Sequence, residues 1–355
     1  MIGKPKRKMR AEKDRLSKLP EYLIDSILER VPVEDALRTS GLSRLQTNCF
    51  NFLEGPILNL HLHIPKNVVL NNFQDVNQWI FSLSRKHNGL RELVLTNSNK
   101  LPYQLPSYLF HCSELRKLHL KNNCIFKPPP PPPPFEDLNN GFPYLNDLSL
   151  AYIAFEANLG ETVIKLPQLE KLKLFLCTNV YNFNITATKL KSLRVVGCHD
   201  AKFIRLLDSQ RLTDIDIIVN KPIPIPRFEE RVNLATMLSN LPYLVALSAD
   251  GCFLKLHLHL DLDMKPALAY LEAASSSDCF DETLNRLKTI RIRRVAGSRP
   301  VLLLIKLLLD HSPNLEMISI EPRVTADDDE NDKFLQDVMR FPRASSKAQL
   351  RLMVH

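Results

Sequence analysis

The chain has 355 residues, of which 45% are hydrophobic, and its formal net charge at pH 7 is +8. No apolar run reaches about 18 residues, so we expect no α-helical membrane span, and the N-terminus has no apolar core typical of a signal peptide. Seven cysteines without a Cys-x-x-Cys pair argue against a zinc finger or a disulfide framework. They predict free thiols in a reducing compartment, the cytosol or the nucleus.

A basic tail occupies residues 1–13, which contain six Lys or Arg residues and one acidic residue, Glu12. Most of the net positive charge therefore lies in this tail, and the rest of the chain is nearly balanced. Such a tail fits a nuclear localisation signal and, equally, a disordered solvated leader. We therefore expect a protein of the nucleus and/or cytoplasm, with no nucleic acid and no membrane among its partners.

Three short helices are predicted in the next segment. Pro20 suits a first helical turn, because its missing N–H has no partner there. An apolar stripe with helical spacing follows, formed by Ile24, Ile27, Leu28 and Val31. Pro32 ends this helix, a second one spans 33–40, and a third begins near Leu42. Three short helices bury little apolar surface, so we expect a partner or the rest of the chain to cover them.

The segment Leu115–Asn123 has the pattern L-x-x-L-x-L-x-x-N, which is the signature of one leucine-rich repeat. Its fourth and sixth residues lie on one face of a short strand, because strand side chains alternate. One unit cannot bury this face alone, so it needs neighbours stacked on both sides. Ten copies of the hexad occur, with first positions at Ile57, Leu90, Leu115, Leu145, Leu169, Leu190, Leu212, Leu244, Leu287 and Leu315.

The spacing and the ninth positions of these copies support the repeat assignment. The shorter gaps match the usual period of about 20–29 residues, and we interpret the longer ones as insertions. An Asn at the ninth position can bond backbone groups of the neighbouring turn, and a buried free Cys acts as a small hydrophobe. Five copies have one or the other: Asn123, Cys177, Cys198, Asn220 and Cys252. The predicted fold class is α/β, a leucine-rich-repeat solenoid of about ten irregular repeats with a curved parallel sheet.

Two segments between the repeats have distinctive compositions. A helix is predicted at Asn77–Ser84, with Trp79 in the core between units. Seven consecutive prolines, Pro128–Pro134, predict a stiff polyproline II segment in a loop. This segment is either a docking site for an aromatic-lined groove or a tolerated expansion on the surface, and we favour the second interpretation.

The segment Lys255–Asp263 alternates strictly between apolar and polar residues, which predicts a strand. Its polar face holds His257, His259, Asp261 and Asp263. These are metal-ligand types, but four groups in a line along one strand do not converge on an ion. We therefore expect a solvent-facing strand and no metal site.

The C-terminal part is expected to close the solenoid, whose open end exposes apolar surface and a strand edge. The segment Val301–Leu309, interrupted by Lys306, predicts a buried helix. After the acidic loop Asp327–Glu330, a helix at Lys333–Arg340 and a final strand at Gln349–Val354 are predicted.

The segment 14–54 resembles an F-box, since it has the Leu19-Pro20 pair, the run LIDSILERVPVEDALRTSGLS and a position ahead of leucine repeats. Together with its C-terminal part, the chain resembles the plant F-box/FBD/LRR-repeat protein family over nearly its whole length. This resemblance implies a division into a disordered basic tail (1–13), an F-box (14–54), leucine-rich repeats (55–285), and last repeats with an FBD-like C-terminal cap (286–355).

In that family the F-box docks the Skp adaptor of a cullin–RING ubiquitin ligase, and the repeats hold the protein to be ubiquitinated. The resemblance places seven residues in or near the adaptor contact, some of which also form the three-helix core: Leu19, Pro20, Ile24, Ile27, Leu28, Leu37 and Leu42. The third helix is atypical, because the family usually has a Trp shortly after the Leu-Ser pair and none follows Leu42-Ser43 here. The implied function is a substrate-recognition subunit, and the alternative is a leucine-repeat scaffold whose F-box has lost adaptor binding.

The hexads also predict a binding face, because their third, fifth and seventh residues point into the concave surface of the sheet. Charged residues at these positions make the surface basic, then acidic, then basic along the chain: Lys117, His119, Lys121, Lys171, Lys173, Arg194, Asp214, Asp216, Arg291 and Arg293. Asp250 is assigned to the same surface. A basic groove can receive acidic or phosphorylated segments, although an ordinary solvated sheet face has the same composition.

No catalytic constellation is found in the sequence. The nine glycines are scattered and form no phosphate-binding loop, and no Ser or Cys has the spacing of an activated nucleophile. We therefore expect a non-catalytic protein without cofactor or metal, whose partners are the Skp adaptor, through it a cullin–RING ligase, and a protein substrate.

Overall fold

The computed structural model describes residues 58–66, 76–77, 80–81, 89–106, 109, 112–126, 142–155, 164–180, 185–198, 209–219, 238, 240–257, 284–323 and 328–353. The basic tail, the F-box segment, Trp79 and Pro128–Pro134 lie outside these residues. Val76, Asn77, Ile80 and Phe81 are helical, in agreement with the helix predicted before the second repeat.

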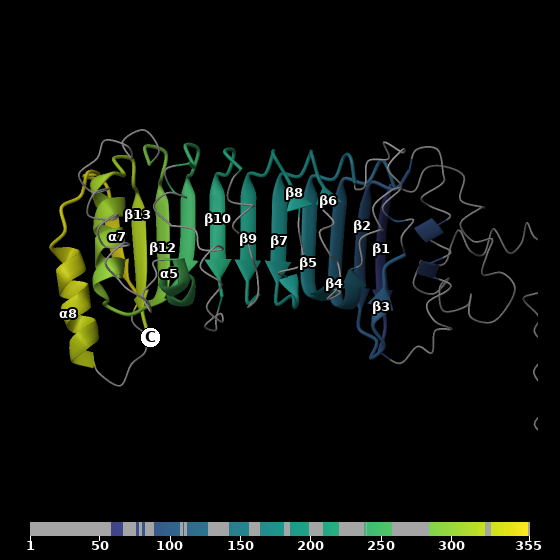
Figure 1. Ribbon diagram of the computed structural model, residues 1–355, viewed down its shortest axis with the longest axis horizontal. Coiled ribbons are helices and arrows are strands. Elements are labelled where there is room, and N and C mark those ends of the chain that lie inside the picture. Colours follow the sequence, from purple (N-terminus) through teal and green to yellow (C-terminus); the bar gives the residue numbers. More distant parts are fainter. Residues whose placement is uncertain are drawn as a thin grey trace, which may run out of the picture.

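One twelve-stranded sheet organises the chain, and its strands follow one another in sequence order (Figure 1). All the pairs are parallel, as predicted. The main path consists of β1 (Asn59–Ile64), β2 (Glu92–Asn97), β4 (Lys117–Phe126), β5 (Asp147–Phe155), β7 (Lys171–Phe175), β9 (Ser192–Val196), β10 (Asp214–Ile218), β11 (Ala246–Asp250), β12 (Thr289–Val295), β13 (Met317–Pro322) and β14 (Gln349–Leu352). The strands β1 to β13 of this path are those of the ten predicted hexads.

Short strands and helices complete the coils of the solenoid, each coil being one hexad strand together with the segment that leads to the next strand. The strand β3 (Tyr103–Gln104) pairs with the end of β4, whereas β6 (Ile164–Lys165) and β8 (Ile185–Thr186) form a separate two-stranded sheet. The helices that the structure describes over their whole length are α5 (Gly251–His257), α7 (Arg299–Asp310) and α8 (Asp328–Met339). In Figure 1, α7 and α8 lie at the C-terminal end of the row of strands.

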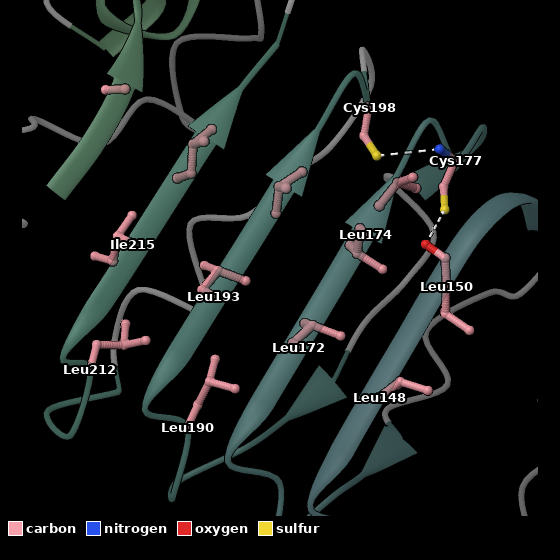
Figure 2. Packing of buried hydrophobic residues seen from close by; sticks show 14 of the residues in the cluster. Leu148, Leu150, Leu172, Leu174, Cys177, Leu190, Leu193, Cys198, Leu212 and Ile215 are labelled. Atoms are coloured by element: carbon pink, nitrogen blue, oxygen red, sulfur yellow. Dashed lines mark hydrogen bonds between the residues drawn. The ribbon is translucent and has the colours of Figure 1, made fainter. Parts of the chain in front are cut away.

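The core consists of rows of leucines that run across the strands. Register pairs the same hexad position from coil to coil, so that Leu148 lies beside Leu172, Leu172 beside Leu193, and Leu193 beside Ile215. All four side chains are at most 2% exposed, and Figure 2 shows them on one side of the sheet. Each row is thus buried only because its neighbours stack on it.

Backbone hydrogen bonds fix where each strand begins. The N–H of the first leucine donates to the carbonyl three residues earlier, as from Leu169 to Leu166 at 3.1 Å. The N–H of the next residue, Glu170, then donates to the carbonyl of Asn146 in the preceding coil at 2.9 Å. The first turn is therefore closed locally, and the strand that follows it is aligned by the coil before it.

Asparagine side chains close the third coil against the second, as the ninth-position pattern predicted. Nδ2 of Asn123 donates to the carbonyls of Asn99 and Lys100 at 3.1 and 3.0 Å. Asn97, which is fully buried, donates in turn to the carbonyls of Asn123 and Leu101 at 2.9 and 3.0 Å. These bonds satisfy backbone groups where strand pairing has stopped.

Cysteines take the same place in later coils. The thiol of Cys177 donates to the carbonyl of Leu150 at 3.3 Å, and the backbone N–H of Cys177 donates to Sγ of Cys198 at 3.4 Å (Figure 2). Both thiols are free and buried, as are those of Cys112 and Cys124. Burial raises the pKa of the Cys124 thiol to about 12, so this group remains protonated. The predicted structural role of the ninth-position cysteines is confirmed for Cys177 and Cys198.

The C-terminal helices cover the end of the core. The buried helix predicted at 301–309 is confirmed by α7, and α8 begins five residues before its predicted start. Phe334 and Val338 of α8 are buried, and a Cβ on Gly297 would lie 2.8 Å from Cβ of Phe334. This close approach requires a glycine beside the helix.

An eleventh coil follows α8, since β14 pairs in parallel with β13. Its turn is closed by Ala348, whose N–H donates to Ser345 O at 3.4 Å, while Ser345 Oγ donates to Leu315 O at 2.6 Å. Ala348 takes the place of the first leucine. The strand β14 begins one residue after it, whereas the other strands begin two residues after the first residue of their hexad. The hexad pattern therefore did not reveal this repeat, although its strand was predicted.

The strand predicted at Lys255–Asp263 is wrong where the structure describes it, because residues 255–257 belong to α5. The carboxylate of Asp250, the last residue of β11, accepts a hydrogen bond from the N–H of Phe253 at 2.9 Å. This is helix N-capping, which turns the chain from strand to helix. Local alternation does not detect such a cap, and residues 258–263 lie outside the described ones.

The dependence of the core on its leucine rows can be measured with Leu172→Ala. We expect this variant to lower the free energy of unfolding by about 2–5 kcal/mol, because a buried cavity replaces the side chain. The exposed neighbour Lys173→Ala, as control, should change it by less than about 0.5 kcal/mol. Urea titration followed by far-UV circular dichroism measures both, and equal small effects would contradict the stacked core.

Candidate functional site on the exposed sheet face

The candidate site is the sheet face opposite the leucine core, which we name the exposed sheet face. It consists of the third, fifth and seventh residues of the hexads, whose side chains alternate with the buried ones. All ten charged residues predicted for the concave surface lie on it, each exposed or half-buried: Lys117, His119, Lys121, Lys171, Lys173, Arg194, Asp214, Asp216, Arg291 and Arg293. Strand register brings those of β4 to β10 into one continuous surface.

Glu92 of β2 offsets positive charge on the first strands of this face. Its carboxylate lies 3.3 Å from Nζ of Lys117 and 3.3 Å from Nε2 of His61. Burial raises the pKa of the Glu92 carboxyl, but contacts with Lys117 and His61 outweigh it and hold the pKa below its usual value. Lys117 is therefore engaged within the sheet and contributes less charge to a partner than the sequence predicted.

Asp147 of β5 is a second acidic residue on the face that the sequence analysis missed. It lies in register between Lys117 and Lys171, and its Oδ1 is 3.3 Å from Nε2 of His119. The contact with His119 holds the pKa of the Asp147 carboxyl below its usual value, against the opposing effect of burial, and Lys173 and Lys171 act in the same direction. The repeat pattern itself would have placed Asp147, as the third residue of the fourth hexad.

The predicted acidic middle of the face is partly neutralised. Oδ2 of Asp216 lies 3.1 Å from Nε of Arg194 on the neighbouring strand. Asp214 accepts a hydrogen bond from Thr213 Oγ1 at 2.6 Å. By contrast, Lys121, Lys171 and Lys173 form no ion pair with any residue that the structure describes. Three lysines on the neighbouring part of β4 and β7 therefore have no ion pair with a described residue, and the same holds for Arg291 and Arg293 of β12.

An exposed aromatic pair is formed by Tyr152 of β5 and Phe175, the last residue of β7. Tyr152 and Phe175 are 51% and 40% exposed, and their ring centroids are 5.5 Å apart at an interplanar angle of 72°. Ala151 and Val196 flank Phe175 in register on either side. Large exposed aromatics of this kind supply anchoring area at protein interfaces.

The comparisons with known proteins agree with this architecture. Residues 76–246 match the family model of the LRR repeats of FBD-associated F-box protein At5g56370. The F-box/FBD/LRR-repeat protein At1g13570 of Arabidopsis thaliana is 27% identical, over 95% of this chain and 98% of that protein. These similarities support the plant F-box/FBD/LRR-repeat family, which the sequence resembles. The FBD-associated F-box protein At3g52670 of Arabidopsis thaliana is also 27% identical, over 74% of this chain and 73% of that protein.

The adaptor contact, a metal site and a membrane span are considered next. The seven predicted adaptor-contact residues, from Leu19 to Leu42, lie outside the described residues. Within the part of the chain that is described, no group of three or more His, Cys, Asp or Glu side chains is placed to hold a metal ion. No described helix has the length and apolar character required to cross a membrane.

Asp250 was wrongly assigned to the binding face, because it is 0% exposed. Besides capping α5, its carboxylate accepts a hydrogen bond from the N–H of Val219 at 3.1 Å and one from Nη2 of Arg294 at 2.7 Å. It therefore ties β11, α5 and β12 together. A Cβ on Gly251 would meet the carbonyl of Arg294 at 2.2 Å, so only glycine permits this close packing after the strand.

Removal of the buried Asp250 carboxylate should destabilise the solenoid. We expect Asp250→Ala to lower the free energy of unfolding by about 3–5 kcal/mol, since it leaves the guanidinium of Arg294 and two N–H groups without this acceptor. The exposed Asp214→Ala is the matched control on the neighbouring strand and should change it by less than about 0.5 kcal/mol. Urea denaturation of both variants checks this, and a small effect at Asp250 would contradict its joining role.

The contact between Asp147 and His119 predicts a pH dependence. Because the folded-state pKa of Asp147 is lowered, its stabilisation is present above the usual value of 3.8 and is lost as the pH falls through the folded pKa. Asp147→Asn should therefore lower the unfolding free energy by about 0.5–1 kcal/mol at neutral pH, and less in acid. Urea titrations at neutral pH and in acid measure this difference in unfolding free energy, and the exposed Asp332→Asn is the control. A difference independent of pH would refute the assignment.

Proposed function

We propose that this protein is the substrate-recognition subunit of an SCF-type (Skp–cullin–F-box) ubiquitin ligase. Residues 14–54 dock the Skp adaptor, and the exposed sheet face holds the target protein. The observation that carries this proposal is a continuous face of outward side chains across the sheet of a chain whose relatives are named F-box proteins. Such a face suits protein recognition, because its side chains are not needed for the leucine core.

The proposed role is non-catalytic. The subunit holds the target near the charged ubiquitin carrier, so that a bimolecular encounter becomes effectively intramolecular. It supplies positioning alone, and bond making is left to other subunits. Rigidity then matters, because a target held on a stiff scaffold stays within reach of the carrier.

The proposed division of the chain follows this role. A basic tail (1–13) and the F-box (14–54) precede the leucine-rich repeats (55–285), and the last repeats with the FBD-like region (286–355) form the C-terminal cap. In support of a cap, α7 and α8 bury their apolar residues at the end of the solenoid, and β14 adds a last coil there. The buried free cysteines support action in the nucleus and/or cytoplasm.

A second candidate function is a leucine-repeat scaffold without ligase activity. The observation that favours it is the absence of a Trp after Leu42-Ser43. Burial of a large aromatic contributes about 1.5–3 kcal/mol, so its absence weakens adaptor docking unless Phe50 or Phe52 fills the place. The two functions differ in one measurable property, which is binding of the Skp adaptor.

The experiment is co-purification of the full chain with the Skp adaptor. We expect the unchanged chain to retain the adaptor and the Leu19→Ala, Pro20→Ala variant to retain at least about tenfold less, since two apolar contacts are lost. The matched control is Leu101→Ala, Pro102→Ala, a second and exposed Leu-Pro pair within the repeats. Loss in the control as well would indicate misfolding rather than a docking defect.

Absence of the adaptor from the unchanged chain would refute the ligase function and favour the scaffold. Whether or not the adaptor binds, proximity labelling with the proteasome blocked would identify what the exposed sheet face binds.

A further inference from the structure

We propose that the exposed sheet face binds an acidic segment of its protein partner through one patch, which we name the aromatic–basic patch. It is formed by Tyr152 and Phe175 together with Lys121, Lys171 and Lys173. The occupant is an extended peptide segment in which an aromatic or aliphatic side chain is flanked by carboxylates. This inference rests on the proposed function only in taking the partner to be the ligase target.

The aromatic part provides the anchor. Tyr152 and Phe175 meet edge to face, so each leaves much of its ring exposed instead of covering the other. The small side chain of Ala151 and the branched one of Val196 lie beside Phe175 in register, and Phe175 remains 40% exposed. An apolar side chain of a partner that settles here removes two aromatic surfaces from water, which is a favourable contribution of the hydrophobic effect.

The basic part sets the charge of the occupant. Lys121 lies on β4 in register with Ala151 and therefore two strands from Phe175. Lys173 precedes Phe175 by two residues on the same face of β7, and Lys171 by four. None of the three lysines is neutralised by an ion pair with a described residue, whereas Lys117 and Arg194 are. An acidic segment supplies carboxylates with which these ammonium groups can form ion pairs.

The boundaries of the patch favour a protein over a nucleic acid. Asp147 lies within the row of lysines, and Asp214 and Asp216 follow on β10. A nucleic acid needs a positive surface that tracks its phosphates, and these carboxylates interrupt such a track. A short acidic peptide segment can place its charges on the lysines and end before β10.

The dimensions of the patch fit a short segment. Its residues lie on the neighbouring strands β4, β5 and β7, and along β7 it runs from Lys171 to Phe175, four residue steps that make about 13 Å at about 3.3 Å per residue. An extended chain covers about 3.3 Å per residue, so roughly four to five residues span it. One apolar residue with an acidic pair on either side therefore matches both its length and its charges.

The test uses the full chain without adaptor and the fluorescein-labelled peptide Glu-Asp-Phe-Glu-Asp, with binding followed by fluorescence anisotropy. We expect saturable binding that weakens with added salt. The peptide with Ser in place of Phe, and the peptide with Lys in place of each acid, should each bind at least tenfold more weakly. Equal binding of all three peptides would overturn the proposal, since neither anchor nor charge would then matter.

Variants of the chain locate the site. Lys171→Glu with Lys173→Glu should weaken peptide binding at least tenfold, and Phe175→Ser should do so without changing the salt dependence. The charge-matched control is Lys165→Glu with Lys333→Glu, two exposed lysines outside the face, and it should bind as the unchanged chain does. Equal loss in this control, with the thermal midpoints unchanged, would overturn the assignment of the patch.

Two further outcomes separate the alternatives. A deoxythymidine decamer that binds more tightly than the acidic peptide would overturn the proposal in favour of a nucleic-acid surface. The Leu19→Ala, Pro20→Ala variant should bind the peptide normally, because this assay contains no adaptor. If the peptide does not bind while the chain retains the adaptor, the patch alone is rejected. If the peptide binds while the unchanged chain does not retain the adaptor, the ligase function alone is rejected.

Discussion

The stacking of in-register leucines, coil on coil, is the constraint on which the rest of this structure depends. Leu148, Leu172 and Leu193 are buried only because each lies beside the next, and the N–H groups at the start of each strand donate to the preceding coil. Stability is therefore a sum over neighbours rather than the property of one central core. A chain built in this way tolerates insertions between coils, provided that the next leucine returns to the same row.

The same constraint leaves the opposite face of the sheet available for function. Side chains at alternate positions do not enter the core, so Lys171, Lys173 and Phe175 can be chosen for what they contact outside the chain. Some of these positions are nevertheless used internally, because Glu92 and Lys117, and likewise Arg194 and Asp216, pair across neighbouring strands. Lys121, Lys171 and Lys173, which have no ion pair with a described residue, lie near the exposed aromatic pair, which is why the proposed partner segment is acidic with an apolar anchor.

Sequence patterns located every hexad strand because alternation and leucine spacing act within a few residues of one another. They did not locate features that depend on a residue's neighbours in space. Asp250 has the same hexad position as Lys121, yet it is buried, because Arg294 and the N–H of Phe253 surround it. The eleventh coil was not recognised as a repeat for a different reason, since Ala348 closes its turn in place of a leucine and the hexad pattern is therefore broken.

The amino-acid sequence by itself determined the solenoid, the ten hexad strands, the alternation of buried and outward side chains along them and the family resemblance, because these follow from a short repeated pattern. Only the tertiary structure decided which outward residues are free to bind. That choice depends on contacts between adjacent coils, such as His119 with Asp147 and Tyr152 with Phe175, whose partners are more than twenty residues apart in the chain. Register brings them together, and no local pattern encodes the distance between them.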